Sequence, residues 1–274
     1  MLVKSAPDRR QWPIGLHEPP QSRYFLPTPT RQGRFTNSRA YSSPFRQSQN
    51  MFNRARYRLL RRLPGSRGRR YSRKFNAFLA LDEFERAIRH TAGKTCIDLG
   101  ANIGHYTQQL AKFASDVIAF EPDPWTFARL QSNLSNFSNV KIENAAAGIK
   151  EGTVLLWRHS RFNDDPDKYS TSSSVISDKF NILDHNQAIE VRQINFINYL
   201  FDLDKEVGII KIDIEGAELD LLEALLERPD LLSRIDYIFC ETHERQIPDH
   251  APRVHNLRAR TDRLTHPRFN LDWH

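Results

Sequence analysis

The amino-acid sequence predicts an α/β protein built on a doubly wound parallel sheet. Three observations lead to this fold class. Apolar strands alternate with amphipathic helices, acidic residues follow several strands directly, and a glycine turn at Gly100–Gly104 joins the first strand to a helix. The 274 residues are enough for one large α/β domain.

The first part of the predicted domain alternates regularly. From Phe75 to Gly93, apolar residues recur at steps of three and four, which predicts an amphipathic helix. Strands are expected at 95–98, 116–121 and 140–143, with helices at 106–113 and 127–137 between them. Their nearly continuous apolar character is typical of parallel strands covered on both faces.

The alternation breaks at about 150–200, where we expect an irregular insertion. Strands at 153–157 and 189–194 flank a long polar loop that contains Tyr169 and Ser172–Ser174. Regular order returns with strands 208–215 and 237–243, which enclose a helix at 219–226. A helix at 253–264 and a strand at 269–272 follow.

Residues 1–74 form a basic extension that we expect to be disordered. They contain 18 lysines and arginines and two acids, whereas residues 75–274 contain 22 lysines and arginines and 31 acids. Three interpretations remain open: an arm that binds nucleic acid or anionic lipid, an organelle transit peptide, or a start-site artefact with Met51 as the true start.

The cysteines and the hydropathy pattern favour a reducing compartment. Cys96 and Cys240 both fall in predicted buried strands, so they read as small core residues and a disulfide framework is excluded. No apolar run approaches the ~18 residues of a membrane span. A cytoplasmic location is therefore expected.

Polar residues gather at the carboxyl ends of the predicted strands. In a doubly wound sheet these ends lie at one edge, where ligands bind. Acids at the same end of four strands therefore predict a site. The residues are Asp98, Asn102, Glu121, Asn144, Asp213, Glu215, Glu241 and His243.

Three cofactor classes use a glycine turn after the first strand. The nucleoside triphosphate motif is absent, and the three-glycine spacing of dinucleotide sites is not met. Asp98 is also expected to repel a pyrophosphate, because no lysine or arginine is expected in the strand-end set to offset it. S-adenosylmethionine is cationic and carries two ribose hydroxyls. Glu121 is placed to accept hydrogen bonds from both hydroxyls. The electrostatics favour this methyl donor.

Four segments together resemble the FkbM family of S-adenosylmethionine-dependent methyltransferases. They are Cys96–Thr107 (CIDLGANIGHYT), Ala119–Pro122 (AFEP), Asn144–Gly148 (NAAAG) and Ile210–Glu218 (IKIDIEGAE), and Glu241–His243 (ETH) also fits. The resemblance covers roughly residues 90–245. It implies a Rossmann-like class I methyltransferase sheet and mostly O-directed methyl transfer to small molecules or sugars.

The strand-end pattern and this resemblance together give the expected cofactor-binding residues. They are Asp98, Gly100, Asn102, Gly104, Glu121, Pro122, Asn144, Ala145 and Asp213. Asn102 replaces a glycine common outside the family, but asparagine tolerates left-handed turns. The fold usually ends in a β-hairpin, whereas the 31 residues after His243 suffice for a helix and one strand, so a truncated hairpin is expected.

His243 and Glu215 are the predicted catalytic residues, and no metal is assigned. An alcohol acceptor must lose a proton, and His243 is the best candidate base because its ordinary pKa lies near neutrality. Its alternative role is to cap Glu241 or a carbonyl. Asp213 and Glu215 could share a divalent metal, or Glu215 could instead order the Gly216 turn.

The expected partner is a small-molecule or carbohydrate acceptor, with no clear nucleic-acid partner. Contact of the basic extension with a membrane surface and the oligomeric state stay open. Two rival functions remain. One is an NAD-dependent oxidoreductase, and the other is a catalytically silent adaptor that binds nucleic acid or membrane through the extension.

Overall fold

A computed structural model describes residues 53–170, 173–176, 183–247 and 249–273. The chain divides into two units, Met1–Gln47 and Ser48–His274, and all described residues belong to the second. Disorder was expected for residues 1–74, of which residues 1–52, with the possible start at Met51, lie outside this description.

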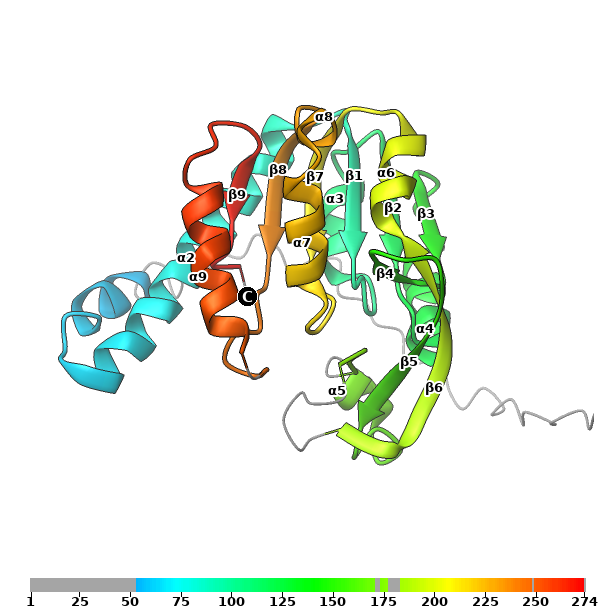
Figure 1. Ribbon diagram of the computed structural model, residues 1–274, viewed down its shortest axis with the longest axis horizontal. Helices are drawn as coiled ribbons and strands as arrows, with labels where there is room; N and C mark the ends of the chain where they lie inside the picture. The colour runs from blue at the N-terminus through cyan, green and yellow to red at the C-terminus, as the bar shows by residue number, and fades with distance from the viewer. Residues whose placement is uncertain (1–52, 171–172, 177–182, 248, 274) are drawn as a thin grey trace, which may run out of the picture. The chain divides into compact units, whose positions relative to one another are not determined.

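A six-stranded sheet forms the centre of the second unit (Figure 1). Its strand order is β3-β2-β1-β7-β8-β9, and every neighbouring pair is parallel. This topology confirms the predicted doubly wound sheet. The strands are β1 (Thr95–Leu99), β2 (Asp116–Phe120), β3 (Val140–Glu143), β7 (Val207–Ile212), β8 (Ile235–Cys240) and β9 (Arg268–Asn270).

Helices cover both faces of this sheet (Figure 1). The face that carries Ile97 and Leu99 packs against α6 (Phe196–Leu203), α7 (Glu218–Leu226) and α9 (His250–Thr261). The opposite face packs against α2 (Gly65–His90), α3 (His105–Ala111) and α4 (Pro124–Leu134), while α8 (Pro229–Leu232) precedes β8. Side chains alternate along each strand, so apolar residues at every position are buried on one face or the other.

The N-terminal boundary predicted at Phe75 is too late. Residues 53–60 are helical, and α2 begins at Gly65, directly after Pro64. The sequence between Gly65 and His90 is free of proline and rich in arginine, a good helix former, so high charge did not signal disorder here. Phe84 anchors α2, with its ring centroid 4.5 Å from that of Trp273.

The predicted irregular insertion contains a second, three-stranded sheet of order β4-β6-β5. β5 (Gly152–His159) and β6 (Leu183–Asn195) are antiparallel and longer than predicted, and β4 (Ala146–Gly148) pairs parallel with β6. The short α5 (Pro166–Tyr169) lies in the connection after β5. Ser174 pairs with Trp157 through two backbone hydrogen bonds of 2.8 and 2.9 Å. This second sheet lies beside the carboxyl ends of β1 and β7 (Figure 1).

The last described elements are α9 and β9. As predicted, one helix and one strand follow β8, and β9 adds to β8 in parallel. Within the described part of the chain, the sheet therefore ends at β9 without an antiparallel hairpin.

Candidate functional site

The glycine turn after β1 is held by close backbone packing. Gly100 has φ of 75°, and a Cβ there would lie 1.8 Å from the Asp213 carbonyl oxygen, so only glycine fits. Asn102 has φ of 49°, which agrees with the expectation that asparagine supports this turn. Gly104, with φ of 92°, is the N-cap residue of α3.

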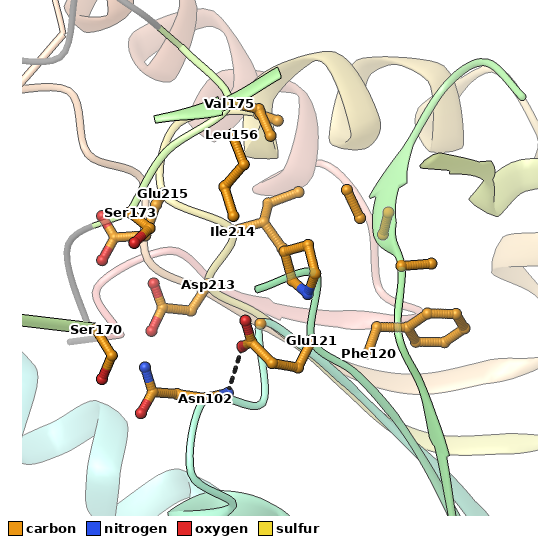
Figure 2. A pocket seen from close by; sticks show the side chains of 16 residues that line it. Asn102, Phe120, Glu121, Leu156, Ser170, Ser173, Val175, Asp213, Ile214 and Glu215 are labelled. Atoms are coloured by element: carbon orange, nitrogen blue, oxygen red, sulfur yellow. Dashed lines mark hydrogen bonds between the residues drawn. The ribbon is translucent and has the colours of Figure 1, made fainter. Parts of the chain in front are cut away.

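Glu121 follows β2 and is buried, with 7% of its surface exposed. Its two carboxylate oxygens accept hydrogen bonds of 2.9 Å from the N–H groups of Asn102 and Asp123. Figure 2 shows the bond from Asn102. The Asn144 side-chain amide donates to the carbonyls of Glu121 and Pro122 and fixes this loop. Burial raises the pKa of Glu121 to about 8, although the two N–H donors act in the opposite direction.

Asp123 joins the two sheets at this edge. It caps α4 by accepting from the Trp125 and Thr126 N–H groups, and α4 starts earlier than predicted because Pro124 follows this cap. Arg158 on β5 forms a bidentate pair with the same carboxylate, at 2.7 and 3.1 Å. The Asp-Pro step was a readable capping signal, but no sequence pattern pointed to Arg158.

A pocket of about 110 Å³ lies between the carboxyl edge of the central sheet and the second sheet (Figure 2). One side is acidic and polar, and the other is apolar. The polar side chains are Asn102, Glu121, Ser170, Ser173, Asp213 and Glu215. The apolar side includes Ala145, Ala146, Leu156, Val175 and Ile214.

The predicted cofactor residues separate into lining and supporting groups. Those that line the pocket are Gly100, Asn102, Glu121, Pro122, Ala145 and Asp213. Asp98, Gly104 and Asn144 lie outside this lining and support the turns around it. Ser170 and Ser173 face the pocket, whereas the Tyr169 ring stacks on His159 at 4.6 Å.

The expectation that no cation offsets Asp98 is wrong. Asp98 is fully buried, and its Oδ1 lies 3.2 Å from Lys211 Nζ, while Thr107 donates to Oδ2 at 2.7 Å. Lys211 also donates to the Gly100 carbonyl at 2.8 Å and lies 3.7 Å from Asp213. Burial disfavours its charge, but Asp98 and Asp213 outweigh that effect and raise the pKa of Lys211. The sequence did not reveal this pair, because it shows that Lys211 alternates with apolar neighbours but not which side chain Lys211 meets.

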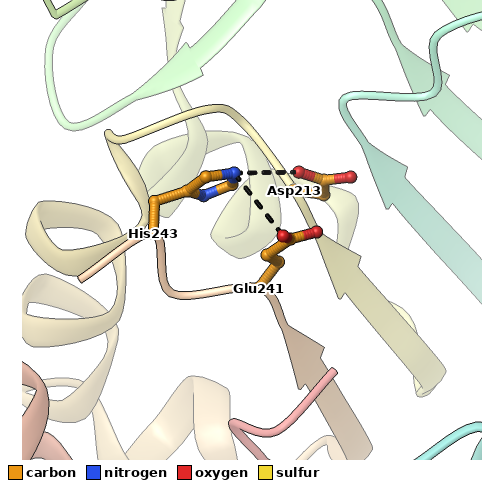
Figure 3. A group of neighbouring side chains, drawn as sticks. All are labelled: Asp213, Glu241 and His243. Carbon is orange, nitrogen blue, oxygen red and sulfur yellow. Dashed lines mark ion pairs between the residues drawn. The ribbon is translucent and has the colours of Figure 1, made fainter. Parts of the chain in front are cut away.

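His243 lies behind the pocket among four carboxylates. Its Nε2 is 3.0 Å from Glu215 Oε2, and its Nδ1 is 3.0 Å from Glu218 Oε1. Asp213 and Glu241 lie 3.9 and 3.8 Å from Nε2 (Figure 3). Burial disfavours the charged ring, but Glu218, Glu241 and Asp213 outweigh it and raise the pKa of His243.

This geometry does not present the free base predicted at His243. The ring is 3% exposed, favours the protonated form, and meets a carboxylate at each nitrogen. The structure instead joins His243 to Glu215, which lines the pocket. Glu218, which no sequence pattern singled out, accepts hydrogen bonds from the N–H groups of Ile214 and Gly216 and so orders this turn through its side chain.

The same cluster is the candidate metal site. Asp213, Glu241 and His243 offer ligand atoms within 4.8 Å of one another (Figure 3). The predicted alternative pair was Asp213 with Glu215. A neutral imidazole and carboxylates suit a divalent transition ion, whereas the neighbouring carboxylates raise the pKa of His243 and so favour its protonated form.

No helix in the described ranges is both long and apolar enough to cross a membrane. The topology and the strand-end site define a Rossmann-like α/β fold with a ligand pocket at its carboxyl edge. Residues 98–264 match the methyltransferase FkbM domain. The chain therefore belongs to the FkbM methyltransferase family, as its motifs indicated.

The similar proteins include one curated relative and two solved structures. "Methyltransferase 1" of Beauveria bassiana is 29% identical over 161 residues, which cover 53% of this chain and 64% of that protein. Methyltransferase FkbM from Methylobacillus flagellatus is 16% identical and covers 66% of this chain and 46% of that one, with a TM-score of 0.34.

The second solved structure is phosphoethanolamine N-methyltransferase 1 of Haemonchus contortus, in complex with phosphoethanolamine and S-adenosylhomocysteine. It is 11% identical and covers 66% of this chain and 29% of that one, with a TM-score of 0.25. Both TM-scores lie below 0.5, so neither structure bears on what this chain binds.

Proposed function

We propose that this chain is an S-adenosylmethionine-dependent methyltransferase that methylates an oxygen of a small molecule or sugar. Family membership supports methyl transfer. The observation that carries the donor assignment is Glu121, a buried carboxyl that lines the pocket beside the Gly100 turn. No lysine or arginine is among the described lining residues, which disfavours the pyrophosphate of NAD.

The pocket residues fit this donor by charge and shape. Glu121 would accept hydrogen bonds from the ribose hydroxyls, in addition to the two N–H donors that orient it. Asp213 and Glu215 offer negative charge to the ammonium and sulfonium groups. Ala145, Leu156 and the other apolar residues would contact the adenine and exclude water.

The bound donor supplies a methyl group that is already activated by its sulfonium. Positioning of the acceptor oxygen then contributes much of the rate. We propose that Glu215, which lines the pocket, takes up the acceptor proton. His243 holds this carboxylate in place through the 3.0 Å ion pair and is a positioning residue in this scheme.

Calorimetric titration of the full chain with S-adenosylmethionine and with NAD tests the donor. We expect the chain to bind S-adenosylmethionine and not to bind NAD. Glu121→Ala should weaken that binding by about 1–3 kcal/mol through loss of the ribose hydrogen bonds, whereas Glu190→Gln, an exposed acid on β6, should leave it unchanged. NAD binding, with none of the methyl donor, would overturn the assignment.

Methyl transfer itself is tested with isotopically labelled donor and panels of phenols, alcohols, glycosides, amines and thiols. Label recovered as a methyl ether on one panel supports O-methylation and identifies the acceptor class. Transfer confined to amines or thiols would overturn the assignment to oxygen while leaving donor binding intact.

A further inference from the structure

A second pocket lies away from the candidate active site and is lined by cations. It has a volume of about 820 Å³ and lies where α2 meets the segment that follows β8. Arg70, Arg73 and Lys74 come from α2, and Arg245 comes from the segment. No acid is among its described lining residues.

The arginines of this pocket lack ion-pair partners within the part of the chain that the structure describes. Arg70, Arg73 and Arg245 form no ion pair with another described residue. Burial and the neighbouring Arg245, Arg69 and Arg70 lower the pKa of Arg73, while Glu244 opposes this shift. A cluster of like charges that exceeds the nearby counter-charge favours the binding of an anion.

The other lining residues are aromatic and apolar. The Tyr57 ring lies 5.7 Å from that of Phe78 and 5.8 Å from that of Tyr71. Lys74 Nζ lies 5.4 Å from the centroid of the Tyr57 ring, and Leu81 completes the apolar side. A ligand that fits both parts of this pocket combines an anionic head with an apolar body.

The pocket is linked to the candidate active site through the backbone. Arg245 is two residues beyond His243, whose ring contacts the pocket-lining Glu215. Two residues span at most about 7 Å, so a ligand held by Arg245 lies near the segment that positions Glu215.

We propose that Arg70, Arg73, Lys74 and Arg245 form a binding site for a phosphate ester that carries an apolar group. Arginine suits this ligand because its planar fork matches two phosphate oxygens. Such an ester could be a free molecule or a lipid headgroup, and both share this chemistry. The site does not depend on the proposed methyl transfer.

The test uses the full chain and 1-naphthyl phosphate as the probe, measured by calorimetry. We expect the probe to bind more tightly than inorganic phosphate, and 1-naphthol not to bind detectably. The double variant Arg73→Gln/Arg245→Gln should weaken binding by roughly tenfold or more, since charge-assisted hydrogen bonds are lost.

The matched control is Arg56→Gln/Arg62→Gln, which removes the same charge at exposed positions of the same region outside the pocket. It should change the affinity less than twofold. Equal weakening by both double variants would show diffuse attraction and overturn the site, as would absence of probe binding to the unchanged protein.

Three further measurements complete the test. Should the pocket variant fold poorly, hydrogen exchange of the unchanged protein must show protection at 70–78 and 243–247 on probe addition, and absence of this protection overturns the proposal.

Competition by phosphatidylcholine vesicles that contain phosphatidic acid, and not by vesicles of phosphatidylcholine alone, identifies a lipid source. Absence of competition identifies a free ester. Tighter binding of a single-stranded oligonucleotide than of the probe would reassign the surface to nucleic acid.

Discussion

Glu121 is a carboxyl whose ionisation changes near neutral pH, because burial raises its pKa to about 8. The ribose hydroxyls of the proposed donor would favour the ionised form. Donor affinity should therefore rise as the pH increases towards 8, by up to about tenfold per pH unit. Calorimetry from pH 6 to pH 9 measures this trend.

The control for this prediction is Glu121→Gln, which keeps the shape and cannot ionise. The ratio of the two affinities removes any titration of the donor itself. A ratio that does not vary with pH would contradict the role of Glu121. The same raised pKa also affects stability. Its contribution to folding is complete below pH 4.5, the ordinary pKa of the unfolded chain, and is lost as the pH rises through 8.

His243 stabilises the fold in the opposite way to a neutral core histidine. Its raised pKa contributes stability to the folded state. This contribution is complete below pH 6.5, the ordinary pKa, and is lost as the pH rises through the pKa of the folded state. His243→Gln removes the ring that faces Glu218 and Glu215 at 3.0 Å and should lower the free energy of unfolding by about 3–5 kcal/mol near pH 7.

Urea denaturation at pH 5 and pH 7 checks this prediction. The loss should be at least as large at pH 5 as at pH 7, because the contribution of the raised His243 pKa is complete below pH 6.5. His255→Gln, at an exposed position of α9, is the control and should change stability little. A smaller loss at pH 5 than at pH 7 would argue against an ion-paired imidazolium.

At the scale of elements, the segment around Ser174 closes the pocket between the two sheets. Ser174 Oγ donates to the Glu215 carbonyl at 2.5 Å and accepts from the Ile176 N–H at 3.0 Å. The enclosed volume of about 110 Å³ is well below the roughly 300 Å³ of small ligand pockets. We therefore expect residues 173–176 to move when the donor enters.

Ser174→Ala removes both side-chain hydrogen bonds and should loosen this closure. Amide hydrogen exchange at 173–176 should become faster, and the donor should associate several-fold faster in stopped-flow measurements. Ser160→Ala, at an exposed position near the end of β5, should change neither rate. Unchanged exchange at 173–176 would refute the closing role of Ser174.

At the scale of the whole molecule, regular patterns were readable and specific pairings were not. The central sheet followed from apolar runs, and Gly100, Glu121 and Asp213 followed from their place after a strand. The Asp98–Lys211 pair was missed because the sequence shows which residues share an edge, but not which side chains meet beneath it.

Charge had different meanings in different parts of the chain. Residues 53–74 are highly basic and were assigned to a disordered arm, yet residues 53–60 and α2 are helical. Tyr57 and Phe75 supply the packing there, with Arg61 4.5 Å from the centroid of the Phe75 ring. Aromatic residues spaced through a basic tract were the signal that could have found this order.

Two truncations should therefore have opposite outcomes. Removal of residues 1–47 cuts at the boundary between the two units, so the melting temperature and donor affinity of the remainder should stay unchanged. Removal of residues 1–64 also deletes Tyr57, which packs on Phe78, and Arg54, which pairs with Asp82 at 2.5 Å.

The longer truncation exposes one face of α2 and should cost about 1–3 kcal/mol from the lost aromatic packing. In a protein of this size, each 1 kcal/mol lowers the melting temperature by about 2–4 °C. Differential scanning calorimetry of both truncations measures the difference. If both melt like the full chain, residues 53–64 do not belong to the cooperative unit; if both melt lower, residues 1–47 contribute to its stability.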